Sequence, residues 1–272
     1  MRSRSRSIFS IFLTSCLSLC LFFNAASVQA QINIPEAESK QLDALVKKAF
    51  QATDAGKFSE AEGYWTELIN LYPENAAGWS NRGNSKISQN RPQDALADYN
   101  KSVELAPNFP DPYLNRGAAL ESLGKWEEAI ADYEQVLKIN PKDAAAYNNR
   151  GNVKGRQGKW QEAIADYEMA MQVDSRFSMA FGNRAIALYE IGQTDQAIKA
   201  MKNILRKYPN FTDIRAALTA ALWTDKKQGE AESNWVSVEN LDPRYRDISW
   251  VKNIRRWPPS LAMALENFLT LK

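Results

Sequence analysis

Residues 76–109 read AAGWSNRGNSKISQNRPQDALADYNKSVELAPNF, and this stretch of 34 residues sets the pattern for most of the chain. The same landmarks recur at a 34-residue step on both sides of it, most strictly as a series of six alanines. An aromatic or large apolar residue follows each alanine by four places, and a proline follows five of the six by twelve. The alanines are Ala61, Ala95, Ala129, Ala163, Ala197 and Ala231. A fixed period of this length is the signature of a solenoid built from repeated structural units.

Within each period, the residues indicate two helices joined by a tight turn. Glycine or asparagine ends the first helix at a place suited to a left-handed backbone, and acidic residues open the second helix and complement its dipole. Gly83, Gly117 and Gly151 lie in the middle of first helices, where glycine costs about 1 kcal/mol relative to alanine. We therefore expect a close approach there to the facing alanine of the second helix. The turn residues are Gly56, Asn90, Gly124, Gly158 and Gly192, and the predicted N-caps are Asn75, Asp143, Ser178 and Thr212.

Six units of 34 residues fit between residues 42 and 245. Residues 31–41 precede them and are expected to form a short, poorly ordered leader, and residues 246–272 follow as a C-terminal cap. Within the cap, residues 260–271 place four apolar side chains on one helical face, which predicts a helix that covers the exposed face of the last unit. These side chains are Leu261, Leu265, Phe268 and Leu269, and the six units start at Leu42, Ala76, Pro110, Ala144, Ser178 and Thr212.

Residues 1–30 have the organisation of a secretory signal peptide. Three arginines precede an uncharged run at residues 8–23, and small residues follow as far as Ala30. This order of basic, apolar and small-residue regions predicts cleavage between Ala30 and Gln31 and export of the mature protein. An uncleaved anchor and lipoprotein processing at Cys16 are the alternatives, the second because the residues at 13–16 resemble a lipobox.

Composition excludes several classes of function. Without the three N-terminal arginines, 31 basic residues stand against 32 acidic ones, a balance that does not favour nucleic acid or an anionic membrane as partner. Both cysteines, Cys16 and Cys20, lie in the signal region, and histidine is absent from the chain. We find no nucleophile-base pair, phosphate loop or metal-ligand spacing. The sequence therefore predicts no enzyme, no catalytic or metal-binding residues and no cofactor.

The pattern of Trp79, Gly83, Ala95, Tyr99 and Pro107, repeated with variations in the other units, resembles the tetratricopeptide repeat family. This resemblance implies an all-α fold, a right-handed α-solenoid of six helix hairpins with a C-terminal capping helix. The export signal, the first unit and the Trp-Pro-Pro sequence at residues 257–259 are also similar to tetratricopeptide proteins of the chloroplast thylakoid lumen and their cyanobacterial relatives. That similarity implies a periplasmic or thylakoid-lumen location and a role in assembling photosynthetic complexes.

In this family the first helices line a concave groove, so the resemblance places an asparagine of four successive units along it. Such a series resembles the asparagine ladder of O-linked N-acetylglucosamine transferase, in which amides pair with the backbone of an extended peptide. The alternative is that each asparagine bonds the backbone of the neighbouring unit. The ladder residues are Asn81, Asn115, Asn149 and Asn183, and the further candidates for peptide binding are Asn84, Asn148, Asn152, Arg156 and Tyr189.

An arginine follows each ladder asparagine, and aspartates recur on the second helices. Either pairing, within a unit or with the next unit, would make these arginines structural. Own-unit pairing leaves Arg184 without an aspartate, whereas next-unit pairing leaves Arg82. The residues are Arg82, Arg116, Arg150 and Arg184, with Asp98, Asp132 and Asp166.

Some family members bind the C-terminal carboxylate of chaperones through a clamp of basic residues and asparagines. Asn84 and Asn115 match the asparagine places, but Ser80, Ala145 and Asn149 occupy the basic ones, which argues against that function here. We therefore expect an exported protein–protein interaction scaffold or assembly factor whose groove binds an extended peptide or a partner helix. The alternative is a cell-envelope assembly lipoprotein anchored at Cys16.

Overall fold

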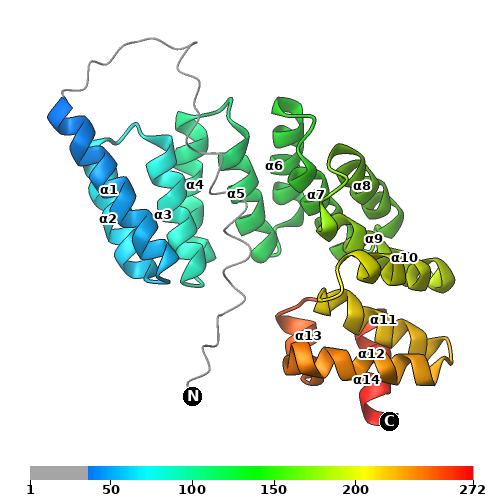
Figure 1. Ribbon diagram of the computed structural model, residues 1–272. Helices are drawn as coiled ribbons and strands as arrows, with labels where there is room; N and C mark the ends of the chain where they lie inside the picture. Colours follow the sequence, from blue (N-terminus) through cyan, green and yellow to red (C-terminus); the bar gives the residue numbers. More distant parts are fainter. Residues whose placement is uncertain (1–35, 272) are drawn as a thin grey trace, which may run out of the picture. The chain divides into compact units, whose positions relative to one another are not determined.

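The computed structural model describes residues 36–271, and the signal region and Cys16 lie outside this range. Nearly all of the described helices belong to one compact part of the chain, Leu45–Lys272. All regular elements of the described residues are helical, as the sequence predicted, and Figure 1 shows their order. They are α1 (Glu36–Asp54), α2 (Phe58–Leu71), α3 (Ala76–Ser88), α4 (Pro92–Leu105), α5 (Pro110–Ser122), α6 (Trp126–Ile139), α7 (Ala144–Arg156), α8 (Trp160–Val173), α9 (Ser178–Glu190), α10 (Thr194–Lys207), α11 (Thr212–Thr224), α12 (Gln228–Leu241), the 3-10 helix η2 (Pro243–Arg246), α13 (Ile248–Asn253) and α14 (Pro259–Leu271).

The helices within residues 45–272 pack in chain order, which is the arrangement of an α-solenoid. From α3 to α12, each first helix packs on the second helix of its own hairpin, and each second helix packs on the next first helix. The first helices also contact one another, α3 with α5, α5 with α7, α7 with α9 and α9 with α11. Second helices of successive hairpins make no contact of comparable extent within the described residues. The first helices therefore form one continuous layer of the solenoid.

The left-handed turn that closes each first helix occurs where the sequence predicts it. Gly56, Gly124, Gly158 and Gly192 have φ angles between +71° and +79°, and Asn90 has a φ of +59°. Lys226 takes the same conformation in the sixth unit, with a φ of +60°, although lysine has no preference for it. Its backbone bonds match those of the glycine turns, since the following amide, that of Lys227, donates to the carbonyl of Leu222. The hairpin geometry thus overrides the local preference there.

Two of the four predicted N-caps are confirmed. Asn75 and Asp143 each accept a hydrogen bond from the backbone amide three residues later, at 2.8 Å. The prediction was wrong for Ser178 and Thr212, which are the first residues of α9 and α11. The residues before them are phenylalanines, and these helices start without a side-chain cap.

The alanine series is the buried seam of the solenoid, because all six alanines have no exposed surface. The mid-helix glycines have a more specific neighbour than the sequence suggested. A Cβ atom at Gly83, Gly117 or Gly151 would lie 2.7 Å from a ring carbon of the tyrosine of the same unit, which is Tyr99, Tyr133 or Tyr167. The residue that excludes a side chain there is thus the aromatic ring four places after each alanine.

The C-terminal helix α14 covers the last unit, as predicted, but it does so from the side of the first helices. It packs mainly on α11 and also touches α9, and it has no contact of that extent with α12. Leu261, Leu265 and Phe268 of α14 are completely buried. α1 begins at Glu36, six residues before the predicted start of the first unit.

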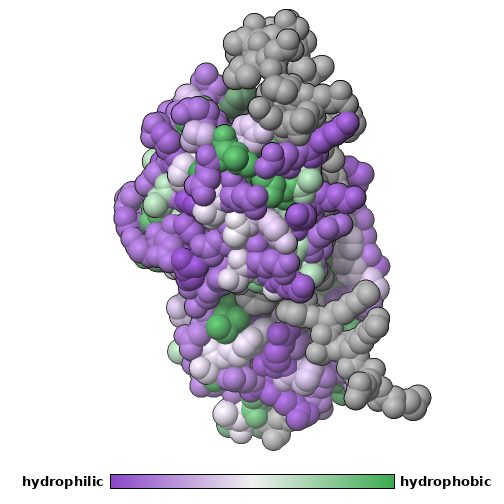
Figure 2. Space-filling view, turned by 90° about the vertical axis from the view of Figure 1, so that its left-hand side faces the viewer, coloured by the Kyte–Doolittle hydropathy of each residue, from purple (hydrophilic) through white to green (hydrophobic). Residues whose placement is uncertain are grey.

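The surface of the solenoid is mainly polar where Figure 2 shows it. Figure 2 shows a mainly hydrophilic face, on which hydrophobic residues form separate small patches. Within residues 36–271, the longest apolar helical stretches fall short of what a bilayer-spanning helix requires.

Candidate functional site

The candidate site is a set of side chains on the first helices, two from each unit. We call this set the asparagine face. It is defined by the sixth and ninth residues of α3, α5, α7 and α9, most of which are partly exposed. The sixth residues are Asn81, Asn115, Asn149 and Asn183, and the ninth are Asn84, Ala118, Asn152 and Ile186. Because the first helices form one layer, these side chains follow one another along a single surface.

The four ladder asparagines are not equivalent. The Asn115 amide donates to the hydroxyl of Ser80 at 3.1 Å, and the Asn183 amide donates to the side-chain oxygen of Asn148 at 2.9 Å. Both acceptors lie 35 residues earlier, at the fifth place of the preceding unit. These two asparagines therefore join successive units, through side chains rather than through the backbone that the alternative reading had suggested.

Asn81 and Asn149 lack such a partner because the residue 35 places earlier is apolar. That residue is Val46 for Asn81 and Leu114 for Asn149, and neither side chain can accept a hydrogen bond. Asn149 accepts a bond of 3.3 Å from its neighbour Asn148, and its own amide hydrogens have no acceptor among residues 36–271. Among the described residues, the Asn81 side chain has no hydrogen-bond partner. The ladder thus alternates between structural and available amides.

At the ninth places, two asparagines are held by buried tyrosines. The Tyr99 hydroxyl donates to Oδ1 of Asn84 at 2.7 Å, and the Tyr167 hydroxyl donates to Oδ1 of Asn152 at 3.0 Å. The same oxygen of Asn152 also accepts from the Asn183 amide at 3.0 Å. Burial raises the pKa of both tyrosines, so their hydroxyls stay protonated and act as donors.

Unit 3 differs from its neighbours at this place. Its ninth residue is Ala118, which is exposed, and Tyr133 donates instead to the carboxylate of Glu121 at 3.3 Å. Burial raises the pKa of Glu121, and burial also raises that of Tyr133. Leu114 lies one turn earlier on α5 and is partly exposed. At the ninth place, the asparagine face therefore has an apolar residue, Ala118, between the asparagines of units 2 and 4. We call this position the apolar step.

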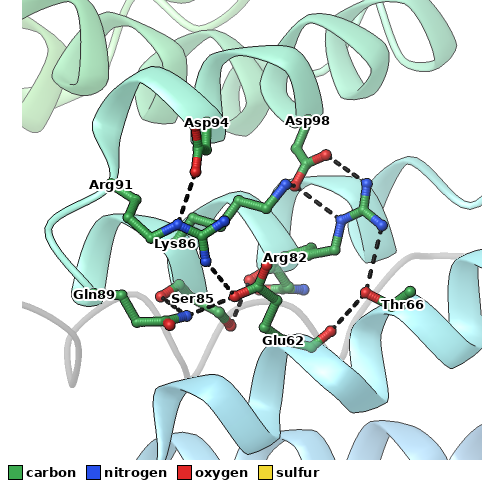
Figure 3. Close-up of polar contacts among 10 residues, drawn as sticks. Glu62, Thr66, Arg82, Ser85, Lys86, Gln89, Arg91, Asp94 and Asp98 are labelled. Atoms are coloured by element: carbon green, nitrogen blue, oxygen red, sulfur yellow. Dashed lines mark hydrogen bonds and ion pairs between the residues drawn. The ribbon is translucent and has the colours of Figure 1, made fainter.

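The arginines after the ladder asparagines form the structural network that the sequence predicted, and the structure selects own-unit pairing. Arg82 binds Asp98 through two hydrogen bonds of 2.9 and 2.6 Å, as Figure 3 shows. Lys86 is a second cation on the same carboxylate, at 2.7 Å. Arg82 also reaches Thr66 of the preceding unit, at 3.4 Å. One side chain thus ties both helices of its own hairpin to the hairpin before it.

The same arginine–aspartate pairing occurs in units 3 and 4 and ends at unit 5. Arg116 binds Asp132 at 2.8 and 2.7 Å, and Arg150 binds Asp166 at 3.0 and 2.6 Å. The bond to the aspartate raises the pKa of each of these arginines. In unit 5 the place equivalent to Asp166 is Ala200, and Arg184 pairs with Glu168 of the preceding unit at 2.8 Å.

Beyond unit 5 the asparagine face is covered by the C-terminal residues. The sixth and ninth places of α11 are Ala217 and Ala220, and both are completely buried, in contrast to the partly exposed asparagines of earlier units. α14 packs on this helix. The alanines at places that carry asparagine elsewhere are the sequence signal that this part of the face is covered.

Two acidic residues of the first helices, which sequence reasoning missed, anchor this C-terminal segment. Asp213 accepts hydrogen bonds from Tyr245, at 2.5 Å, from the Trp257 indole, at 2.9 Å, and from Arg255. Glu190 accepts from the backbone amide of Leu261, at the start of α14, at 3.0 Å. These bonds join residues 32 to 71 places apart, so no local pattern indicated them.

The remaining predicted site residues fall into two groups. Arg156 is exposed at the end of α7, so it is accessible to a ligand. Asn148 has no exposed surface, and Tyr189 is 8% exposed with its hydroxyl bonded to Thr224 at 3.0 Å. The structure therefore places Asn148 and Tyr189 in the packing between units. In the described part of the chain, carboxylates do not gather into a group that could hold a metal ion.

Comparison with known families identifies the class of protein. Family models described as TPR repeat and tetratricopeptide repeat match residues 83–124, 121–158, 144–177 and 183–210. Together these segments run from the middle of α3 to the turn after α10. Residues 83–210 are therefore built from tetratricopeptide repeats.

Curated relatives share only a short part of the chain. The Hsp70-Hsp90 organizing protein of Triticum aestivum is 42% identical over 67 residues, which are 25% of this chain and 12% of that protein. The Hsp70-Hsp90 organizing protein 2 of Arabidopsis thaliana is 37% identical over the same length and coverage. The matched region thus spans about an eighth of either relative.

Solved structures show the same fold over more of the chain. A tetratricopeptide repeat protein from Parabacteroides merdae has a TM-score of 0.65 and 19% identity, and the match covers 85% of this chain and 98% of that one. MamA has a TM-score of 0.54 and 22% identity, with coverage of 62% and 92%. YrrB, described as a TPR protein with an unusual peptide-binding site, has a TM-score of 0.51 and 19% identity, with coverage of 66% and 92%.

Proposed function

We propose that this protein is an exported scaffold or assembly factor that binds an extended segment of a partner protein on its asparagine face. The observation that carries the proposal is the set of partly exposed amides with free N–H groups on Asn81, Asn84, Asn149 and Asn152. Side-chain amides pair with peptide backbone independently of the peptide's sequence, because every residue presents a carbonyl. A series of them along one surface suits an extended chain.

The names of the relatives support binding of a protein partner. The residues of this chain indicate the chemistry of that partner. YrrB is described as having a peptide-binding site, and the curated relatives are named as organizers of Hsp70 and Hsp90. In this chain the places for basic clamp residues hold Ser80, Ala145 and Asn149. The Ser80 hydroxyl is moreover occupied by Asn115. We therefore infer a partner segment with little net charge.

The test starts from peptides selected from a random library on the full chain. Replacing Asn81 and Asn149 together by alanine is expected to lower the affinity for the selected peptides by at least about tenfold, because each lost hydrogen bond contributes about 1 kcal/mol. The control replaces Gln161 and Gln172 by alanine, since both are exposed amides on α8. Isothermal titration calorimetry measures both variants. Unchanged affinity of the Asn81/Asn149 variant for every selected peptide would exclude these two amides as contacts of the peptide.

Export is the second part of the proposal and rests on the basic, apolar and small-residue regions of residues 1–30. Mass spectrometry of the mature protein is expected to find Gln31 as the first residue, in the periplasm or the thylakoid lumen. A diacylglycerol-modified Cys16 at the N-terminus would instead establish the lipoprotein alternative. Recovery of the chain starting at residue 1 or 2 would contradict both.

A further inference from the structure

Units 2 and 4 share a tyrosine–asparagine pair that unit 3 lacks, and this difference defines the chemistry of the ligand. We propose that Asn84 and Asn152 are two hydrogen-bond donor sites on either side of an apolar step at Ala118. The ligand is an extended peptide that brings two main-chain carbonyl acceptors, with an apolar side chain between them. This inference rests on the proposed function and names the partner segment that the site would take.

The tyrosines determine which way the two amides point. Tyr99 is 1% exposed and Tyr167 is 3% exposed, so each hydroxyl must use a partner inside the protein. That partner is the side-chain oxygen of Asn84 or Asn152. With the oxygen held by a buried donor, the NH₂ group of each partly exposed amide is directed away from the tyrosine. Tyr99 and Tyr167 are therefore positioning residues.

At Asn84, Asn149 and Asn152, the hydrogen-bonding groups that remain open are donors. The oxygen of Asn84 is taken by Tyr99, that of Asn152 by Tyr167 and Asn183, and that of Asn149 by Asn148. The NH₂ groups of these three asparagines have no partner among residues 36–271. A ligand must then supply acceptors, and a main-chain carbonyl is the acceptor that every peptide residue carries.

The apolar step between the donors has room for a side chain. Ala118 occupies the ninth place of α5, where its neighbours α3 and α7 have asparagine, and it is exposed. Leu114 on the same helix is partly exposed, and Ile87 at the end of α3 is 37% exposed. A polar ligand side chain would find no partner at Ala118 or Leu114, whereas an apolar one would bury surface there.

Neither side of this region has a further amide donor at the ninth place, since unit 5 carries Ile186 there. In unit 1 the ninth residue is Phe50, whose ring packs edge-on against Trp65 with centroids 5.2 Å apart. In unit 6 the ninth residue is Ala220, which lies buried where α14 packs on α11. The two donor sites are thus confined to units 2 to 4.

The decisive variant replaces Asn84 and Asn152 by aspartate. Aspartate preserves size and the acceptor for each tyrosine, but it replaces the outward NH₂ by an oxygen. Affinity for a library-selected peptide is expected to fall about 100-fold, or about tenfold for each donor removed. The matched control, Gln172→Glu with Asn267→Asp, adds the same two charges at exposed positions and is expected to stay within about twofold of wild type.

The role of the tyrosines is tested by exchanging main-chain carbonyls of the peptide, one at a time, for thioamides, which are weaker acceptors. Two positions are expected to lose affinity on the wild type and to lose none on the Asn84→Asp/Asn152→Asp protein. Tyr99→Phe with Tyr167→Phe is expected to reduce the same two thioamide effects, which a purely structural role would leave unchanged. Circular dichroism confirms that each variant is folded at the temperature of measurement.

A photoreactive leucine at the apolar position of the peptide separates this inference from the proposed function. Its crosslink is expected within α5, near Ala118. If the crosslink forms there but the double aspartate variant binds within twofold of wild type, the donor assignment is overturned while the binding face stands. If the wild type crosslinks only outside the first helices, the proposed function itself fails.

Discussion

Replacing Phe268 by alanine is expected to lower the free energy of unfolding of the C-terminal hairpin by about 3–5 kcal/mol. Phe268 has no exposed surface, and its ring packs edge-on against Trp223 and Trp235, with centroids 5.3 and 5.4 Å apart. Truncation would remove these contacts and leave a cavity between α14, α11 and α12. Because α14 then loses its central anchor, the covered surface of α11 around Ala217 and Ala220 should become accessible.

Hydrogen exchange measured by mass spectrometry, together with chemical denaturation, checks this result. Exchange should rise in α14 and α11 and stay unchanged in α3 to α6, since each repeat contacts only its neighbours. Met263 on the same helix is 61% exposed, so Met263→Ala is the matched control and should change stability by less than about 0.5 kcal/mol. Equal effects of the two substitutions would refute the docking of α14 on α11.

Replacing Asp98 by alanine is expected to destabilise the central units by about 3–5 kcal/mol, because it leaves two largely buried cations without their carboxylate. The Asp98 side chain is 2% exposed, and those of Arg82 and Lys86 are 16% and 13% exposed. Both cations lie within hydrogen-bonding distance of this single carboxylate in Figure 3. Asp98→Asn keeps the shape but loses the charge, so it should also be strongly destabilising.

The control for this prediction is on the same helix. Asp94 pairs with Arg91 at 2.7 Å, but its side chain is 52% exposed, and surface pairs of this kind contribute about 0.2–1 kcal/mol. Asp94→Ala should therefore shift the urea midpoint only slightly. If Asp98→Ala shifts it no further than Asp94→Ala does, the arginine network is not what holds the hairpins together.

The alternation of units is a property that neither the period nor the family pattern conveys. Units 2 and 4 have asparagine at the ninth place and a lysine, Lys86 or Lys154, that binds the aspartate of the network. Unit 3 has Ala118 and Leu120 at the corresponding places. A 34-residue repeat thus carries a surface that changes from one unit to the next. The uniform part of the unit maintains the packing, and the variable part changes the hydrogen-bonding groups that the surface presents.

Sequence reasoning was most successful where the determining chemistry is local. A left-handed turn needs glycine or asparagine, so Gly56 and Asn90 marked the end of a first helix by their own backbone preference. The buried alanines and the bulky residues four places later share one period because every hairpin must solve the same steric problem. The close approach predicted at the glycines occurs, with the carbonyl oxygen of Ala163 3.2 Å from a Cβ atom at Gly151, and the tyrosines that lie nearer still belong to the same pattern.

The tertiary structure decided which side chains pair. Among residues 36–271, Asn115 bonds the preceding unit and Asn81 does not, because the residue 35 places earlier is Ser80 in the first case and Val46 in the second. Arg116 could have met Asp132 of its own unit or Asp98 of the preceding unit, and only the packed helices selected Asp132. Such outcomes depend on distances between helices, which no single period contains.

The C-terminal segment shows most clearly what the local sequence determines and what contacts between distant residues determine. Sequence alone determined that residues 260–271 form an amphipathic helix, because the spacing of Leu261, Leu265 and Phe268 is a property of the helix itself. Where that helix docks was decided by Asp213 and Glu190, which bind groups 32 to 71 residues away. Periodic local preferences specify the hairpins, whereas contacts between distant, unrepeated residues specify which part of the asparagine face remains open.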